Sequence, residues 1–563
     1  MEAKTLRTIG ATLVLAALVV AGIAQARSEQ DAGPVAIVTG TTTTTDAEEP
    51  TTGHSTEPFT YRVGVLSGIS TNNFWAFYGS EPSAWNSYIL GPTKPALFTT
   101  NGAGASLRPE LAVAHAEPAQ DDRGWFVTLD LDTELHWSDG SPVTADDVVF
   151  TFDTVRTLDL GGSWAESLPD VVEGVEADGD HRLTIRFSER PRLSVWPHGV
   201  GTAPIMAAHA WRDAVEVSKP GELYELSGDG DVGGGPLAIS DVSDVLIVSS
   251  RNHGYPSGHA PDVVEYHVYS SEGAAAEALL DGDIDYVLSP KGMTSEQVKL
   301  LAEAPTAGML TSPGNVVRYL GFNLERKPMS DQAFRTALAL LLDRDRLADA
   351  SPSAQVARSL VPEANSAWFD GEAETAIIAI HGGDFDERLG RALENLRAAG
   401  YSWETAPALG PDGGLVAGSG LTKDGTEVAP LTILTSGDAH DPARPEYATA
   451  IADTLADLGF DVRPVETDFD TVVDLAFTPG EAGELNYDLY LLGWTLGNPV
   501  LPGYYGTLFS ADGVMNNTGY ASAEFDRAHD SYRDAYTMAE ARAALWSMER
   551  ILAEDLPYLP LYT

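Results

Sequence analysis

The 563-residue chain contains no cysteine. This absence excludes disulfide bonds, thiolate metal sites and thiol catalysis, and it also excludes a lipid-modified N-terminal cysteine. Lysine is scarce as well, so the basic residues are mostly arginine. Whatever the chain does must therefore be done without sulfhydryl chemistry.

Basic charge is also in short supply, because 34 Lys and Arg face 83 Asp and Glu and leave a net charge of -49. Nucleic acids and anionic lipid surfaces both need basic protein surface, so neither is expected as a partner. An acidic surface keeps a protein hydrated and soluble. The balance indicates either a halophilic, salt-tolerant source or simply an acidic exported protein.

The common catalytic motifs are missing too: there is no G-x-S-x-G, no H-E-x-x-H and no P-loop. Gly228 to Gly233 spells G-x-G-x-x-G, but strand-like Leu237 to Ile239 follows where a dinucleotide site needs a helix. His253 and His259 are the one close histidine pair, and a loop pair is weak support for a metal. We expect no enzyme, no metal and no cofactor.

Two acidic segments look functional and have simpler interpretations. The run Asp281 to Asp285 resembles a calcium loop, but Tyr286 stands where that loop needs glycine and Gly292 where it needs a bidentate acid. Asp146 and Asp147 follow Thr144, a good N-cap, and acids in a first turn suit the helix dipole. We interpret the first as a turn and the second as a helix start.

Only the N-terminus is long and apolar enough to enter a membrane. Lys4 and Arg7 precede the apolar run Ile9 to Ile23, which ends at Ala24-Gln25-Ala26. This pattern predicts a signal peptide over 1–26, or else an uncleaved anchor. Residues 27–58, with a threonine run, read as a disordered linker. We expect an exported protein, periplasmic or at the cell surface.

The ordered part divides at two buried apolar strands, Val316 to Leu324 and Leu489 to Trp494, which we interpret as crossings between two α/β lobes. Alternating helices and strands lie between them. The predicted organisation is lobe 1 over 59–322 with an inserted subdomain at about 105–235, lobe 2 over 323–488, and a return to lobe 1 over 489–563. The chain ends in an apparent strand, so we expect the natural protein to continue.

Individual elements follow from periodicity and caps. Ser330 is predicted to cap a helix, and Gly400 and Gly459 are predicted to end two others. The stretch Tyr487 to Tyr505 begins as a strand and breaks into a Gly- and Pro-rich loop, a common way to position a ligand.

The aromatic segment Ser67 to Trp85 either stacks on that ligand or packs as core. The candidate ligand contacts are Trp494, Thr495, Gly497, Asn498, Asn323, Trp75, Asn73 and Tyr504.

Five segments together resemble a known family. They are HWSDGSPVTADDVVFTF (His136 to Phe152), GGGPLAI (Gly233 to Ile239), LLDGDIDYV (Leu279 to Val287), YLGFNLERKPMSDQAFRTALALLLDRDRL (Tyr319 to Leu347) and YDLYLLGW (Tyr487 to Trp494). In order and combination they resemble the family 5 extracellular solute-binding proteins of ABC importers, which include oligopeptide-, dipeptide- and nickel-binding members. The resemblance implies a two-lobed periplasmic-binding-protein-like fold with two crossing strands and an extra subdomain on lobe 1.

The resemblance also implies the partners: a peptide or other small-molecule solute, and ABC transporter permease subunits. We expect a monomer. In peptide-binding relatives an aspartate shortly after the tryptophan of the second crossing pairs with the peptide amino terminus. Here Thr495, Leu496, Gly497 and Asn498 follow Trp494 without an acid, which favours a sugar, a neutral oligomer or a modified peptide.

A second resemblance, through WSDGSPVTADD and FNLERKPMSD, is to an actinobacterial offshoot of the family linked to cell-wall glycolipid assembly. It keeps an alternative open: a non-transport cell-envelope factor that binds a glycolipid or a partner protein. A hydrolase is the weakest hypothesis, since no nucleophile constellation is present.

Overall fold

The computed structural model describes residues 59–101, 106–256, 261–289, 293, 295–308, 316–350, 354–411, 414–437, 441, 443–480, 483–495 and 502–563. They fall into two compact units, one ending at Ser312 and one spanning Pro313–Thr563. The predicted signal peptide and linker lie outside the described residues. Within the described ranges, every helix is too short or too polar to cross a bilayer.

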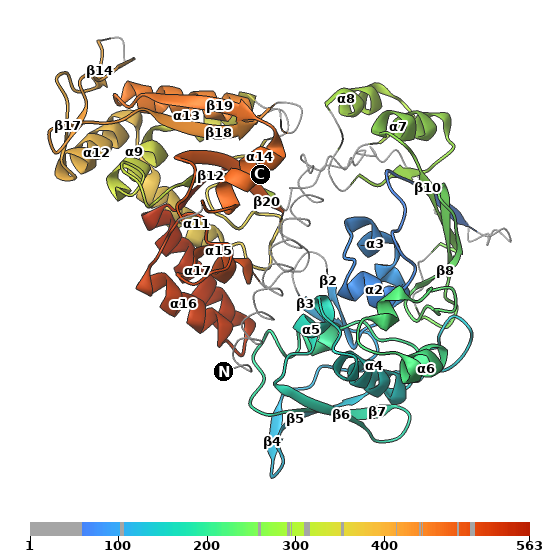
Figure 1. Cartoon of the computed structure of the whole chain (residues 1–563). Coiled ribbons are helices and arrows are strands. Elements are labelled where there is room, and N and C mark those ends of the chain that lie inside the picture. The colour runs from blue at the N-terminus through green and yellow to red at the C-terminus, as the bar shows by residue number, and fades with distance from the viewer. Residues whose placement is uncertain are drawn as a thin grey trace, which may run out of the picture. The chain divides into compact units, whose positions relative to one another are not determined.

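The first unit is built on two larger sheets and the two-stranded antiparallel pair β2–β3 (Figure 1). A five-stranded sheet has the order β11-β1-β10-β9-β8, and β1 runs parallel to both β10 and β11. A four-stranded antiparallel sheet has the order β4-β5-β7-β6 and lies within the segment predicted as an inserted subdomain. The strands are β1 Thr60–Val65, β2 Phe98–Asn101, β3 Ser106–Pro109, β4 Ala119–Asp121, β5 Gly124–Asp130, β6 Val172–Ala177, β7 Arg182–Phe187, β8 Leu237–Val242, β9 Leu246–Arg251, β10 Val263–Val268 and β11 Tyr286–Val287.

One helix start in this unit confirms its sequence prediction. Thr144 caps α4, and the Asp147 side chain accepts from the Thr144 backbone N–H in a capping box. Buried Asp147 also accepts from the Trp137 indole and from the Ala208 amide. The helical segments of the unit are α2 Phe74–Gly79, α3 Ala84–Ile89, η1 Gly91–Thr93, α4 Ala145–Thr157, α5 Ser163–Ser167, η2 Val200–Thr202, α6 Ala208–Val217, η3 Glu222–Glu225, α7 Glu272–Asp281 and α8 Ser295–Glu303.

The second unit has one main sheet of five strands in the order β19-β18-β20-β12-β21. The two predicted crossing strands, β12 and β20, pair with each other from Val316↔Thr495 to Phe322↔Leu489. Their buried faces explain their continuous apolar sequences. The strands are β12 Val316–Phe322, β13 Tyr401–Ser402, β14 Ala408–Leu409, β15 Leu415–Val416, β16 Thr422–Lys423, β17 Thr426–Glu427, β18 Leu431–Ser436, β19 Val462–Thr467, β20 Leu489–Thr495 and β21 Tyr558–Tyr562.

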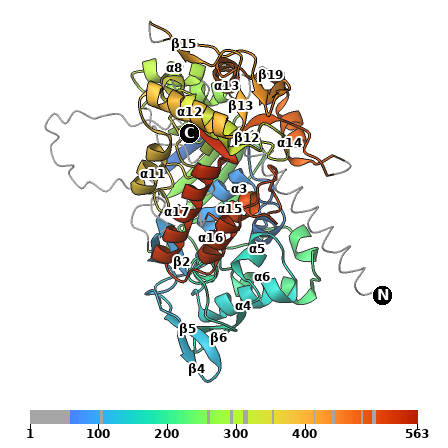
Figure 2. The ribbon, with the colours of Figure 1, turned by 90° about the vertical axis from the view of Figure 1, so that its left-hand side faces the viewer.

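Helices pack on both faces of this sheet, and α16 and α17 lie side by side in both views (Figures 1 and 2). One face buries Leu320 and Leu491 in a core shared with α9 and α13. The helices are α9 Gln332–Leu341, α10 Arg344–Ala350, α11 Gly371–His381, α12 Phe385–Ala398, α13 Arg444–Asp457, α14 Phe469–Phe477, α15 Tyr504–Phe509, α16 Ala523–Arg533 and α17 Met538–Asp555.

Two sequence predictions differ from the structure. Residues 489–563 were expected to return to the first lobe but belong to the second unit. The reason is strand pairing, because β20 and β21 flank β12 in the same sheet. The N-cap of α9 is Asp331, one residue beyond the predicted Ser330.

Candidate functional site

In each unit the parallel strands deliver their carboxyl ends to one edge of the sheet. In the first unit β1, β10 and β11 end at Val65, Val268 and Val287. The segments that follow carry exposed Ser67 and half-buried Tyr269. Ligands of α/β proteins bind beyond the carboxyl ends of parallel strands, so this edge is the candidate ligand surface of the first unit.

The corresponding edge of the second unit is formed by β18, β19 and β20. Both β19 and β20 run parallel to β18, and the three strands end at Ser436, Thr467 and Thr495. The predicted contact Trp494 lies at this edge, opposite Val317 of β12. The sequence prediction that a rigid strand presents this tryptophan at a strand end therefore agrees with the structure.

Trp494 is half-buried, and its ring meets Phe477 edge-on at 5.8 Å between centroids. The indole N–H is buried and lies near the hydroxyls of Tyr319 and Tyr558. Burial raises the pKa of both hydroxyls, and the indole lowers it again in part. The polar atom of Trp494 is thus turned inward, so its accessible surface consists of ring carbons.

A buried ionic cluster occupies the same edge on the opposite face of the sheet. Asp441 Oδ2 accepts from Arg318 Nε at 2.9 Å and from the Tyr562 hydroxyl at 3.0 Å, and it lies 3.6 Å from Arg444 Nε. Burial by itself raises the pKa of Asp441, but the two guanidinium groups outweigh it and hold the carboxyl below its usual range. Arg444 also donates to Ser436, at the end of β18.

Sequence analysis did not identify Arg318, Asp441 or Arg444. Arg318 had a readable signal, because it is the single charge within the buried strand VVRYLGF. A charge is kept in such a strand only when it is paired or functional. Asp441 and Arg444 precede and begin α13 and carry no comparable signal.

Two predicted contact residues hold the fold together. Asn323 is fully buried and donates to the backbone oxygens of Leu485 and Tyr487. Tyr504, on α15, donates to the Leu360 carbonyl at 3.3 Å. Thr495 ends β20, and its side chain lies outside the described residues, as do Gly497 and Asn498. Ligand contact by these five residues stays a prediction.

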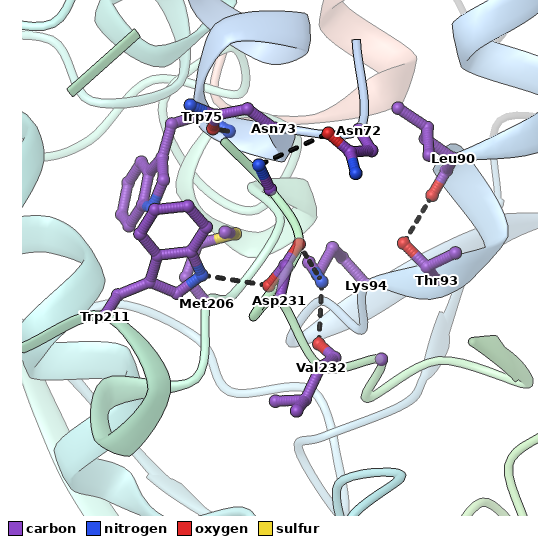
Figure 3. Close-up of polar contacts among 12 residues, drawn as sticks. Asn72, Asn73, Trp75, Leu90, Thr93, Lys94, Met206, Trp211, Asp231 and Val232 are labelled. Atoms are coloured by element: carbon purple, nitrogen blue, oxygen red, sulfur yellow. Dashed lines mark hydrogen bonds and ion pairs between the residues drawn. The ribbon is translucent and has the colours of Figure 1, made fainter. Parts of the chain in front are cut away.

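Asn73 and Trp75 lie in the first unit and are both fully buried (Figure 3). Asn73 Oδ1 caps α2 by accepting from the Trp75 amide, while Nδ2 donates to the carbonyls of Leu223 and Leu226. Trp75 packs against Trp164 at 4.9 Å between centroids. Of the two interpretations offered for the aromatic segment, the core interpretation describes these side chains. Their contact with a ligand stays a prediction.

The glycine-rich segment that spells G-x-G-x-x-G packs against the start of α2, and a strand rather than a helix follows it. Lys94 Nζ lies 2.7 Å from Asp231 Oδ2 and donates to the Val232 carbonyl, and Asp231 Oδ1 accepts from Trp211 (Figure 3). Asn72 accepts from the Gly228 amide. The chain then enters β8, which confirms the predicted turn into a strand.

Metal ligands are not gathered anywhere in the described part of the chain, where no three His, Asp or Glu side chains converge on one point. Of the calcium-like run, Asp285 pairs instead with Arg62 of β1 at 2.7 Å. His259 lies outside the described residues, so the weak histidine pair is not placed.

Comparison with known proteins identifies the family. Residues 106–516 match the model described as bacterial extracellular solute-binding proteins, family 5 Middle. The peptide transport periplasmic protein SapA of Salmonella typhimurium is 25% identical over 439 residues, covering 74% of this chain and 71% of SapA. The periplasmic murein peptide-binding protein MppA of Escherichia coli is 24% identical over 474 residues, covering 80% and 79%.

Solved structures show the same fold. The substrate-binding protein CtaP of Listeria monocytogenes superposes with a TM-score of 0.67 at 20% identity, covering 90% of this chain and 93% of that one. The unliganded open form of MppA gives 0.66 at 19% identity, covering 94% and 92%. The two-lobed α/β fold predicted from sequence is therefore confirmed. The chain belongs to the bacterial extracellular solute-binding proteins of family 5.

Proposed function

We propose that this protein captures a peptide-like or other oligomeric solute outside the cytoplasmic membrane and delivers it to the permease of an ABC importer. Family membership supports this proposal, and so do relatives named for peptide transport and murein peptide binding. In this proposal the solute is bound and released unchanged, and the protein acts as a monomer without nucleic acid.

The observation that carries the proposal is the position of Trp494 at the carboxyl edge of β18, β19 and β20. A half-buried aromatic ring at such an edge suits a ligand that is held by shape and stacking. Because its N–H is buried, Trp494 offers the solute ring carbons and no hydrogen-bond donor.

This geometry bears on the solute class. No acid follows Trp494 over the next four residues, so a free ammonium group lacks the charged partner expected for simple peptides. A stacking ring serves a sugar, a neutral oligomer or a blocked peptide equally well. The proposed solute is therefore one without a required free amino terminus.

Native mass spectrometry of the purified protein tests the proposal, because a captured solute adds a defined mass that denaturation removes. Calorimetric titration with that solute then compares Trp494→Ala with Trp494→Phe. Losing a buried ring costs about 1.5–3 kcal/mol, so we expect roughly tenfold or greater weakening for Trp494→Ala. Trp494→Phe keeps a ring and should stay within a few fold.

Unchanged affinity of a folded Trp494→Ala protein would remove Trp494 from the site. Chemical conversion of the solute during the titration would contradict the non-catalytic part of the proposal. Failure of any oligomeric solute to bind would contradict the proposal as a whole.

A further inference from the structure

A buried acid lies in the second unit, away from the strand ends described above. Glu549 is in the middle of α17 and is 4% exposed. Its Oε1 accepts a short hydrogen bond from the Ser359 hydroxyl and one of 3.3 Å from the Tyr505 hydroxyl of α15. Ser359 Oγ in turn accepts from the Val361 amide, which fixes the direction of its donated hydrogen. Glu549 thus joins three separate segments.

A small cavity adjoins Glu549 and has room for about one water molecule. His381, the last residue of α11, lines the same cavity and is 7% exposed. Its Nε2 faces the Ala553 carbonyl at 3.0 Å and therefore carries the hydrogen. Nδ1 is left as an acceptor, buried and without a hydrogen-bond partner among the described residues. An acceptor in a cavity of this size calls for a donor inside it.

A neutral Glu549 supplies what the cavity needs, because a carboxylic acid can donate one hydrogen bond and a carboxylate cannot. One water between the acid and His381 Nδ1 would complete the hydrogen bonding of both. The charged and titratable groups around Glu549 on the surrounding segments are Arg344, Arg358, Asp370, His381, Tyr504, Tyr505 and Tyr558. Burial raises the pKa of Glu549 from 4.5 to about 7, and the Ser359 and Tyr505 hydrogen bonds oppose that rise.

We propose that Glu549 is a proton-binding anchor at the junction of α11, α15, α17 and the segment 357–361. The neutral acid is buried there without the desolvation cost of a charge, and release of its proton to the medium loosens the junction, because the Ser359 and Tyr505 hydrogen bonds offset only part of that cost. Family members act outside the cytoplasm, where the medium sets the pH. The inference does not rest on the proposed solute, and its failure would leave solute capture untouched.

The anchored helix is connected to the candidate site by a series of contacting aromatic rings. Phe509 of α15 lies 4.9 Å from the Tyr558 ring, and Tyr558 stacks on Tyr319 at 3.9 Å. The Tyr319 hydroxyl lies near the Trp494 indole. A change in the packing of α15 is therefore transmitted through direct contacts to Tyr319, which lies next to Trp494 in the candidate site.

Glu549→Gln tests the inference, because glutamine has the shape of the neutral acid and cannot ionise. The folded-state pKa lies above the unfolded one, so the stabilising effect is complete below pH 4.5 and is lost as pH rises through about 7. We expect the unfolding constant of the wild type, relative to Glu549→Gln, to grow on the order of 10²-fold between pH 4.5 and 8. Glu554→Gln, on the exposed side of the same helix, should show the same pH dependence of the unfolding constant as the wild type.

Infrared difference spectroscopy gives a second readout that needs no variant. The wild type should show a protonated buried carboxyl band that disappears with a midpoint near pH 7. Tyr505→Phe removes a hydrogen bond to the carboxylate and should move that midpoint upward. Parallel pH profiles for the wild type and Glu549→Gln, or the absence of a protonated carboxyl at pH 6, would overturn the inference.

Discussion

Lys94 and Asp231 form an ion pair whose Nζ–Oδ2 distance is 2.7 Å and whose side chains are only 2% and 10% exposed (Figure 3). The pair ties the glycine-rich segment before β8 to the residue after η1. Its ammonium also lies 5.4 Å from the Phe74 ring centroid. An ion pair sealed this well has its charges largely out of water, so each partner depends on the other.

We expect Lys94→Met to destabilise the protein by about 3–5 kcal/mol, because it leaves the Asp231 carboxylate buried without its cation. The double variant Lys94→Met with Asp231→Leu should recover much of that loss, since no charge then remains buried. Urea unfolding monitored by tryptophan fluorescence measures both. Arg463→Ala is the control: its ion pair with Asp461 is 72% and 50% exposed. Its loss should cost less than about 1 kcal/mol. A folded Lys94→Met protein within 1 kcal/mol of the wild type would contradict the prediction.

His381 should also contribute to the pH dependence of stability. Burial lowers the pKa of His381 from 6.5 to about 4. Its stabilising contribution is therefore present above pH 6.5 and is lost as pH falls through 4. Relative to His381→Gln, the wild type should lose about 3 kcal/mol over that range. Relative to Glu549→Gln, by contrast, the wild type should lose stability as pH rises. If the wild type lost stability in the same pH direction relative to both variants, the protonation states assigned to His381 and Glu549 would both be contradicted.

Salt should stabilise the chain. A net charge of -49 repels itself in the compact state, and molar salt reduces the screening length to about 3 Å. We expect the thermal midpoint to rise between 0.1 and 2 M KCl by more than it does in sucrose of equal osmolality. A midpoint that does not respond to KCl would favour an acidic exported protein over a halophilic one.

Local signals predicted several elements well. The spacing of Thr144 and Asp147 predicted the start of α4, and Gly400, with φ of +92°, ends the turn after α12 as its sequence suggested. These signals act over a few residues and need no knowledge of the rest of the chain. What they could not predict is the second use of Asp147 as acceptor for Trp137 and Ala208.

Assignments that depend on long-range packing were harder. The sequence around Trp75 is equally compatible with a ligand surface and with a core. Only its contacts with Trp164 and Trp211 distinguish the two. Residues 489–563 were assigned to the wrong lobe because a strand does not encode its neighbours. The partner of β21 is β12, more than two hundred residues earlier.

That pairing sets the order in which the protein can assemble. β12 starts at Val316, but the strand that covers its outer edge ends at Tyr562, so the second unit lacks part of its sheet until residue 562 has been synthesised. Among the described residues, all strands of the first unit have been synthesised once the chain reaches Val287. The hydrophobic core of the first unit can form while the second unit is still being synthesised, so the first unit can fold before the second.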